Sequence, residues 1–131
     1  MSERVRLSES IERTATAIVD SAFKVHKALG PGLLESVYET CLTHELTKRG
    51  HLLQRQVLLP IVYDDLRLES GLRLDLIVDG GIIVEIKAVE RDAPVFLAQL
   101  MSYLKLANKR LGFLINFNVP AIKQGIKRVM L

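Results

Sequence analysis

Two acidic residues and a lysine lie around a glycine turn in the middle of the chain. Asp75 precedes the turn at residues 79–81, an Asp-Gly-Gly sequence, and Glu85 and Lys87 follow it. Carboxylate oxygens are the ligands that a hard cation such as Mg²⁺ accepts, and an ammonium group beside them can hold an attacking water or offset the charge of a transition state. These residue types in this order indicate metal-assisted cleavage of a nucleic-acid phosphodiester.

The length of the turn decides whether the two carboxylates share one face of the predicted hairpin. A two-residue turn would place Asp75 and Glu85 on opposite faces, because successive strand residues point to opposite sides of a sheet. A three-residue loop centred on Gly80 instead pairs Val78 with Ile82. That register brings Asp75 opposite Glu85, so we expect the three-residue loop.

A purely structural role for these charges is the alternative, because opposite charges across an exposed hairpin face also stabilise sheets. The apolar run at residues 82–84, followed by Ile86, favours a central strand around Glu85. Charges on a central strand are costly unless they are paired or bound to a metal. The setting therefore favours the metal site.

Three helices are predicted, the first from apolar residues that recur at steps of three and four and the others from start and stop signals. Ser8 or Ser10 can cap the first helix, and Gly50 ends the second. Asp92 as a cap and Pro94 in the first turn predict the start of the third. The predicted helices span residues 9–29 and 33–49, and the third extends to about Asn108.

Alternating apolar residues predict the strands, and the mixture of helices and strands indicates an α/β fold around a largely central sheet. Pro60 lacks an amide donor, so its strand should lie at a sheet edge. Residues 64–65 should form a turn and residues 70–71 an irregularity. The strands are expected over residues 57–63, 66–78, 82–88 and 111–117, with residues 122–131 forming a last strand or a helical turn. In the second strand, one face should carry Leu72, Leu74, Leu76 and Val78, and the other Arg73, Asp75 and Ile77.

Two helical motifs supply further candidate residues. Gln99 and Tyr103 are four residues apart and share a helix face, where they can offer an amide and a phenol to a phosphate. The alternative is that they only lie at the edge of the hydrophobic core. Gly32-x-x-Glu35-x-x-Tyr38 opens the second helix, with Glu35 and Tyr38 expected on nearly the same side. Glu35 can be a third acidic contribution to the metal, or it can only favour the helix dipole.

Two other side chains are expected to have structural roles. His26, like Phe23, lies beside the apolar stripe of the first predicted helix, where a histidine is more often a packing residue than a ligand. Cys41 is the only cysteine, which excludes an internal disulfide and a thiolate zinc site, and its apolar neighbours indicate burial.

The length of 131 residues and a hydrophobic content of 49% predict a single domain over residues 1–131. There is no apolar run of about 18 residues and no secretory signal at residues 1–6, so we expect a cytoplasmic protein without a membrane segment.

The formal charge of +3 permits attraction to a polyanion. Six basic residues in the C-terminal part of the chain gather in two groups. These would line a nucleic-acid backbone if their segments adjoin, or else they lie on a solvated surface. The groups are Lys105, Lys109 and Arg110, and Lys123, Lys127 and Arg128.

Taken in order, these motifs resemble the GxxExxY family of the PD-(D/E)XK nuclease-like superfamily. The similarity runs from about His26 into residues 125–128, Gly-Ile-Lys-Arg. It implies a restriction-endonuclease-like core with a mixed sheet flanked by helices. Leu74 replaces the proline of the superfamily pattern, and that proline is dispensable to metal binding. The matching segments are residues 32–38, 73–75, 85–88 and 99–103.

The resemblance also implies the roles of the site residues. Lys87 would lie beside the nucleophilic water. Gln99 and Tyr103 resemble the helical Gln-x-x-x-Tyr element of RecB-type and phage-lambda-type exonucleases, where it helps to arrange the site and the DNA end. The implied cofactor is Mg²⁺, with Mn²⁺ as a possible substitute. The implied metal contacts are the side chains of Asp75, Glu85 and Glu35 and the carbonyl of Ile86.

The function that follows is a Mg²⁺-dependent nuclease acting on DNA. A non-catalytic nucleic-acid-binding or partner-binding module with the same fold is the alternative. A small-molecule enzyme has little support, because the chain lacks a glycine-rich nucleotide loop, a zinc signature and a nucleophile elbow. Because one small domain covers little DNA, a symmetric homodimer is a reasonable expectation. DNA or RNA as substrate, and endo- or exonuclease action, stay open alternatives.

Overall fold

The computed structural model describes residues 7–131, and the prediction about a secretory signal falls on residues 1–6, outside the described range. The elements follow the predicted order. They are α1 (Glu9–Leu29), α2 (Glu35–Lys48), β1 (Leu53–Tyr63), β2 (Leu66–Val78), β3 (Ile82–Lys87), α3 (Pro94–Ala107), β4 (Leu111–Asn116), the 3₁₀ helix η1 (Ile122–Gly125) and β5 (Ile126–Met130).

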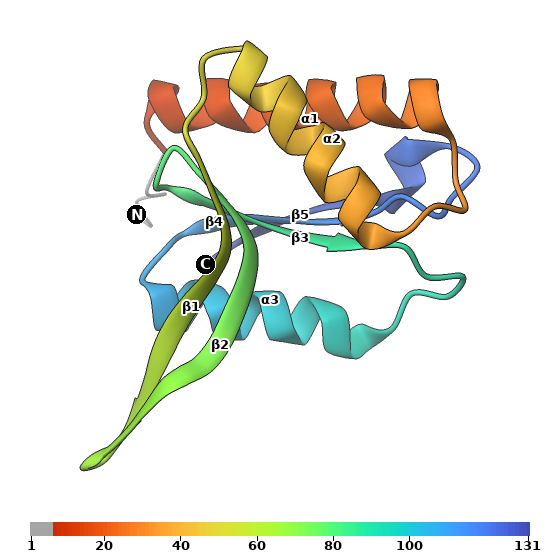
Figure 1. Ribbon diagram of the computed structural model, residues 1–131. Helices are drawn as coiled ribbons and strands as arrows, with labels where there is room; N and C mark the ends of the chain where they lie inside the picture. The colour runs from red at the N-terminus through yellow and green to blue at the C-terminus, as the bar shows by residue number, and fades with distance from the viewer. Residues whose placement is uncertain (1–6) are drawn as a thin grey trace, which may run out of the picture.

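The strands form one mixed sheet in the order β1-β2-β3-β4-β5, in which only β3 and β4 run parallel. Helices α1 and α2 cover one face of the sheet and α3 covers the other (Figure 1). The predicted α/β fold with a mixed central sheet is therefore confirmed. Pro60 lies in the edge strand β1 and Glu85 in the central strand β3, as expected. Within residues 7–131, no helix has both the length and the apolar character to cross a bilayer.

Strand β3 divides its side chains between two apolar cores. Ile82, Val84 and Ile86 pack with α1 and α2, whereas Ile83 packs with α3. By strand alternation, Glu85 lies on the α3 side of the sheet. The sheet face beneath α3 is therefore where the candidate site must be assembled.

The hairpin between β2 and β3 has the predicted three-residue loop, because Val78 pairs with Ile82. Asp79 and Gly80 have φ angles of 51° and 67°, in the left-handed region that such a loop requires. The ladder ends at Leu76 and Val84, one pair before Asp75 and Glu85. The two acidic residues thus lie where the strands separate.

One predicted strand face is wrong. Leu76 and Val78 pack on the α1 and α2 side, but Leu74 packs in the core beneath α3. Strand β2 leaves β3 beyond Leu76 and bends away from the sheet with β1, so simple alternation is not maintained (Figure 1). The predicted irregularity at residues 70–71 is confirmed as a register shift between Leu59 and Ile61, opposite residues 69–71.

Several predicted boundaries need correction. Strand β1 begins at Leu53 instead of residue 57, and α2 begins at Glu35 instead of residue 33. Asp92 does not cap α3, because the cap position is Ala93, one residue later, and the Asp92 carboxylate pairs with Lys127. Pro94 does occupy the first turn of α3, and the tail contains both the helical turn and the strand that were open alternatives.

Asp79 connects three segments that are distant in sequence. Its carboxylate accepts hydrogen bonds from the Thr14 hydroxyl at 2.8 Å, from His51 Nδ1 at 2.7 Å and from the Leu52 amide at 2.9 Å. These contacts join α1 and the segment before β1 to the β2–β3 loop. Although partial burial would raise the pKa of Asp79, the hydrogen bonds from these three groups lower it below its usual range.

We expect Asp79→Asn to lower the free energy of unfolding by about 1 kcal/mol at pH 7. A carboxylate with a lowered pKa stabilises the fold at high pH and loses that effect as the pH falls through its folded-state pKa. The difference from the wild type should therefore shrink in acid, as measured by urea denaturation from pH 7 to pH 3. Asp64→Asn is the control, because Asp64 also has a positive φ of 54° but is exposed in the β1–β2 turn. An equal loss in both variants would contradict the prediction.

Candidate active site

Hydrogen bonds between backbone amides and side-chain carboxyl groups join Asp75 on β2 to Glu85 and Ile86 on β3. The Asp75 amide donates to Glu85 Oε2 at 3.0 Å, and the Ile86 amide donates to Asp75 Oδ2 at 2.8 Å. Each carboxyl group thus accepts a hydrogen bond from a backbone amide of the other strand. This exchange fixes the two carboxyl groups side by side at the point where the strands diverge.

Burial makes this pair electrostatically unusual. Glu85 is buried, and its pKa rises to about 9 because of desolvation, the adjacent Asp75 charge and a hydrogen bond with the Asp75 side chain. The opposing effects of the Asp75 amide and of the Lys87 charge are smaller. Glu85 therefore holds a proton at neutral pH while no cation lies between the carboxyl groups.

Lys87 lies two residues beyond Glu85 on the same face of β3. Its Nζ atom is 4.6 Å from the centre of the Phe96 ring at the start of α3, a cation–π contact. Because Lys87 is only partly buried, its charge stays accessible at the end of the strand. The ring of Phe96 limits the directions in which the ammonium group can point.

Helix α3 brings Tyr103 towards the acidic pair. Burial raises the pKa of Tyr103, and the charges of Glu85 and Asp75 raise it further. The phenol therefore keeps its proton and can donate a hydrogen bond beside the carboxyl groups. Gln99 lies one turn earlier on the same side of α3 and is exposed to solvent.

The two motif residues on α2 have different surroundings. Tyr38 is completely buried and stacks on Phe117 with ring centres 4.5 Å apart. Its hydroxyl donates to the Gly30 carbonyl at 2.7 Å and accepts from the Leu33 amide at 3.0 Å, which holds the α1–α2 loop closed. Glu35, three residues earlier, is exposed in the first turn of α2.

The described part of the chain, residues 7–131, brings no three His, Cys, Asp or Glu side chains close enough to hold a metal by themselves. Asp75 and Glu85 are the two acidic groups that meet, whereas Glu35 is exposed at the start of α2. A metal at this pair would need main-chain or water oxygens to complete its ligands.

His26 has a structural partner. Its Nε2 atom lies 2.8 Å from the Val119 carbonyl oxygen, which joins the end of α1 to the loop after β4. This contact agrees with the packing role that was expected. Cys41 is only partly buried, so the expectation of a buried thiol is corrected.

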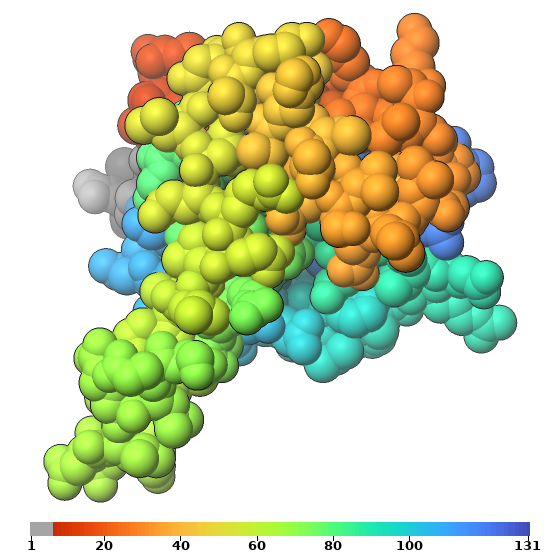
Figure 2. Space-filling view, in the orientation of Figure 1, coloured from red at the N-terminus to blue at the C-terminus, as the bar shows by residue number. Residues whose placement is uncertain are grey.

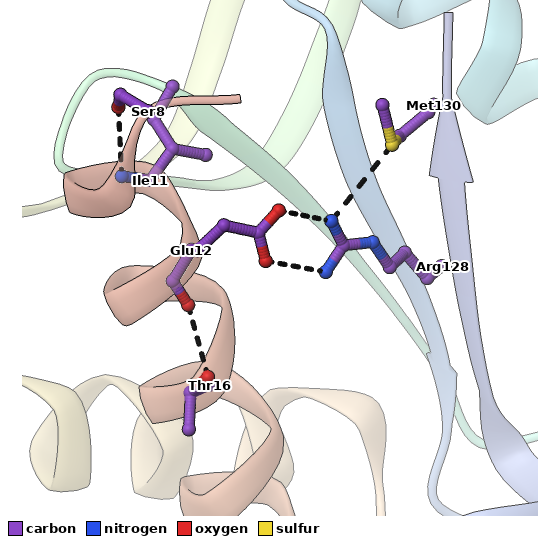
Figure 3. A network of polar contacts seen from close by, with 6 residues as sticks. All are labelled: Ser8, Ile11, Glu12, Thr16, Arg128 and Met130. Atoms are coloured by element: carbon purple, nitrogen blue, oxygen red, sulfur yellow. Dashed lines mark hydrogen bonds and ion pairs between the residues drawn. The ribbon is translucent and has the colours of Figure 1, made fainter. Parts of the chain in front are cut away.

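The second group of the predicted basic rim is divided between the two faces of the sheet. Arg128 lies on the α1 side, where its guanidinium binds both carboxylate oxygens of Glu12 at 2.7 and 3.3 Å (Figure 3). Lys127, the residue before Arg128 in β5, pairs with Asp92, which precedes α3. Neighbouring strand residues point to opposite faces, so these two charges cannot line one surface.

Asn116 is an organising residue that the sequence analysis did not identify. It is buried at the end of β4, beside Lys87 in the parallel register. Its side chain accepts from the Val89 and Asn118 amides at 3.1 Å and donates to the Val89 carbonyl at 3.0 Å. It thereby fixes the loop that follows β3. A polar residue that ends the apolar run at 111–115 was the available signal.

Comparison with known proteins gives one match. The family model described as the PD-(D/E)XK nuclease superfamily matches residues 12–129, which include the acidic pair, Lys87 and all of α3. No curated protein and no solved structure matches the chain.

Proposed function

The chain belongs to the PD-(D/E)XK nuclease superfamily, and on that premise we propose that it is a Mg²⁺-dependent nuclease that hydrolyses phosphodiester bonds of DNA. The observation that carries this proposal is the contact between Asp75 and buried Glu85. A stabilising function would favour an ion pair here, whereas two adjacent carboxyl groups raise the free energy of the fold. The Glu85 proton and the nearby Lys87 only partly offset that cost.

The donor set fits a divalent cation. The Asp75 and Glu85 carboxyl groups lie side by side, and desolvation and the Asp75 charge raise the pKa of Glu85, which is the situation that a bound cation would relieve. The Ile86 amide donates to Asp75, and in a strand the amide and carbonyl of one residue point to the same neighbour, so the Ile86 carbonyl is a reasonable third ligand. Glu35 would contribute through water. Bound Mg²⁺ would supply Lewis-acid polarisation of the scissile phosphate and a lowered pKa for water. Mn²⁺ would be a substitute.

The chain's own residues would position and neutralise the reacting groups. Lys87, held against Phe96, would orient the attacking water or offset negative charge on the phosphorus as it gains a fifth oxygen. Tyr103 keeps its proton beside the carboxyl groups and would donate to a phosphate oxygen. Gln99, exposed one turn away, would contact the nucleic-acid backbone.

The proposal also includes DNA as the substrate and membership of the GxxExxY family. The motif residues at 32–38 and 99–103 support the family, and the net charge of +3 is compatible with a polyanion. Arg73 is exposed two residues before Asp75 and would contact a phosphate near the site. A cytoplasmic location and a homodimer complete the proposal.

The test is cleavage of single-stranded, double-stranded and branched DNA with Mg²⁺ or Mn²⁺. We expect Asp75→Asn and Lys87→Met to lower the cleavage rate by a factor of at least about 100, because each removes charge that acts on the transition state. Circular dichroism should show that both variants fold.

Lys27→Met is the matched control, because Lys27 is an exposed lysine on α1, on the opposite face of the sheet. It should cleave at the wild-type rate. A wild-type protein that binds DNA but cleaves none of these substrates would instead support the non-catalytic binding module, and RNA cleavage alone would overturn the choice of DNA.

A further inference from the structure

Strands β1 and β2 extend beyond the sheet as an arm, which we define as residues 58–72. The arm projects past the layer of α3 and away from the body of the molecule (Figures 1 and 2). The pairing of β2 with β3 covers only Leu76 to Val78, so the arm is a two-stranded ribbon without a third strand. Such a ribbon is marginally stable in water by itself.

One face of the arm is apolar. Tyr63 pairs with Leu66 and Ile61 pairs with Leu68, and directly paired residues share a face. Tyr63, Leu66 and Leu68 are 76%, 55% and 47% exposed. The other face carries Val62 opposite Arg67, which forms an ion pair with Glu69. The arm is therefore an amphipathic ribbon whose apolar face is uncovered.

The outer face of α3 is also apolar and uncovered. Val95, Met101 and Leu106 are 54%, 44% and 48% exposed. Exposed Ala98 and Ser102 lie between them, and Lys105 is the only charged residue in the helix. Most exposed helices carry several charges, so this composition indicates a partner.

These two surfaces adjoin at the base of the arm. Leu59, at the base of the arm, packs against the core beneath α3. Beyond Leu59 the pairing of β1 with β2 shifts register, and the apolar face of the arm runs from Ile61 to the tip. The C-terminal half of α3 is the part nearest to the arm in Figure 1. The arm and α3 therefore form the two walls of an open corner.

We propose that this corner binds a second copy of the chain, with the arm of each copy lying across α3 of the other around a twofold axis. Charge favours this pairing, because the arm tip carries Asp64 and Asp65 while the outer face of α3 carries only Lys105. In an isologous contact, the arm and the α3 surface of both copies take part, so each surface occurs twice in the interface. This inference rests on the homodimer of the proposed function and names its interface, but it does not depend on the nuclease activity.

The exposed area is of the size that a dimer requires. Six large apolar side chains, three on each wall, are about half exposed. At roughly 150–200 Å² for a large side chain, they would bury on the order of 500 Å² per copy. The arm backbone and the small residues of α3 would bring the total towards the roughly 800 Å² per partner of a standard interface.

Nucleic acid does not fit the same surface. Within the arm, Asp64, Asp65 and Glu69 outnumber Arg67, the only basic residue, so its net charge is −2. An apolar and negatively charged arm would repel a phosphate backbone. Lys105 is therefore expected to pair with the arm of the second copy instead of with DNA.

The first test is the solution mass, measured by light scattering during gel filtration over a range of concentrations. The wild type should be a dimer, and Leu66→Asp should raise the dimer dissociation constant at least tenfold. Val62→Asp is the matched control, because Val62 is 60% exposed on the opposite face of the same arm, and it should stay dimeric. A monomeric wild type, or equal loss in both variants, would overturn the proposal.

The second test identifies the contact. Lys105→Glu should weaken the dimer, and adding Asp64→Lys and Asp65→Lys should restore it. In a Cys41→Ser background, mixing Asp65→Cys protein with Lys105→Cys protein should give mainly the mixed disulfide dimer on oxidation. Same-variant dimers in equal or greater yield, or a charge reversal without rescue, would mean a different interface. Neither readout requires nuclease activity, so failure of this inference and failure of the proposed function are distinguishable.

Discussion

Glu85→Gln is expected to make the metal-free protein more stable at pH 8 and, in the same molecule, to remove metal-dependent cleavage. The folded state keeps Glu85 protonated up to about pH 9, whereas the unfolded chain releases that proton near pH 4.5. Between these values the unfolded state binds fewer protons, so the stability of the wild type falls as the pH rises. Gln is neutral at every pH and avoids that loss.

The predicted gain is on the order of 3 kcal/mol at pH 8 and close to zero at pH 4.5. In a chain of this size it corresponds to a rise in melting temperature of roughly 10 °C. Thermal unfolding of both proteins from pH 4.5 to pH 8 measures it. Mg²⁺ or Mn²⁺ should raise the melting temperature of the wild type but not of Glu85→Gln, because the variant loses a ligand.

Glu45→Gln is a control with the opposite sign. Glu45 is also buried, but the hydrogen bond from Lys24 lowers its pKa. A carboxylate of that kind stabilises the fold above its unfolded-state pKa, so its replacement should destabilise the protein at pH 8. If Glu85→Gln were destabilised in the same way, Glu85 would be an ordinary ion-paired carboxylate, and the proposed metal site would lose its main support.

Gly125→Ala is expected to cause the largest loss of stability of any alanine substitution at a glycine. An added Cβ atom would lie 2.0 Å from the Asn116 carbonyl oxygen, and neither backbone can move aside without disturbing β4. We expect a loss of about 3 kcal/mol or more, measured by urea denaturation. Because Asn116 fixes the loop after β3, the activity of the folded fraction should fall as well.

Two other glycines give a graded control series. At Gly81 the nearest atom to an added Cβ is 3.9 Å away, so Gly81→Ala should change stability by less than about 1 kcal/mol. At Gly112 the added atom would lie 2.9 Å from a Leu100 methyl group and 3.2 Å from the Ile83 carbonyl oxygen, which predicts an intermediate loss. A different order of stability loss among the three variants would mean that local flexibility, and not the close approach of neighbouring atoms, determines the loss.

Local sequence signals identified most of the elements, because each signal acts over a few residues. The apolar period of α1 and the cap at Ser8 predicted Glu9–Leu29 without error. The Asp-Gly-Gly turn predicted the pairing of Val78 with Ile82 and hence the approach of Asp75 to Glu85. Asp92 failed as a predicted cap because α3 begins at Pro94 and its cap position is Ala93, which leaves the Asp92 carboxylate to pair with Lys127.

The face assignments of β2 failed for a different reason. Alternation assumes a regular strand, but β2 bends where its pairing with β3 ends, and Leu74 therefore joins the core beneath α3. Tyr38 was a motif residue in the sequence, yet its role in closing the α1–α2 loop depends on Gly30 and Leu33 being brought back to its hydroxyl. Neither effect can be inferred from spacing.

The amino-acid sequence by itself determined the order of the elements, the edge position of β1, the central position of β3 and the meeting of two carboxyl groups across one hairpin. These follow from local periodicity and turn geometry. Only the tertiary structure decided the surroundings of those groups: the burial that keeps a proton on Glu85, the approach of Tyr103 from α3 and the separation of Lys127 from Arg128. Burial and long-range charge depend on how distant segments pack, and no short stretch of sequence contains that information.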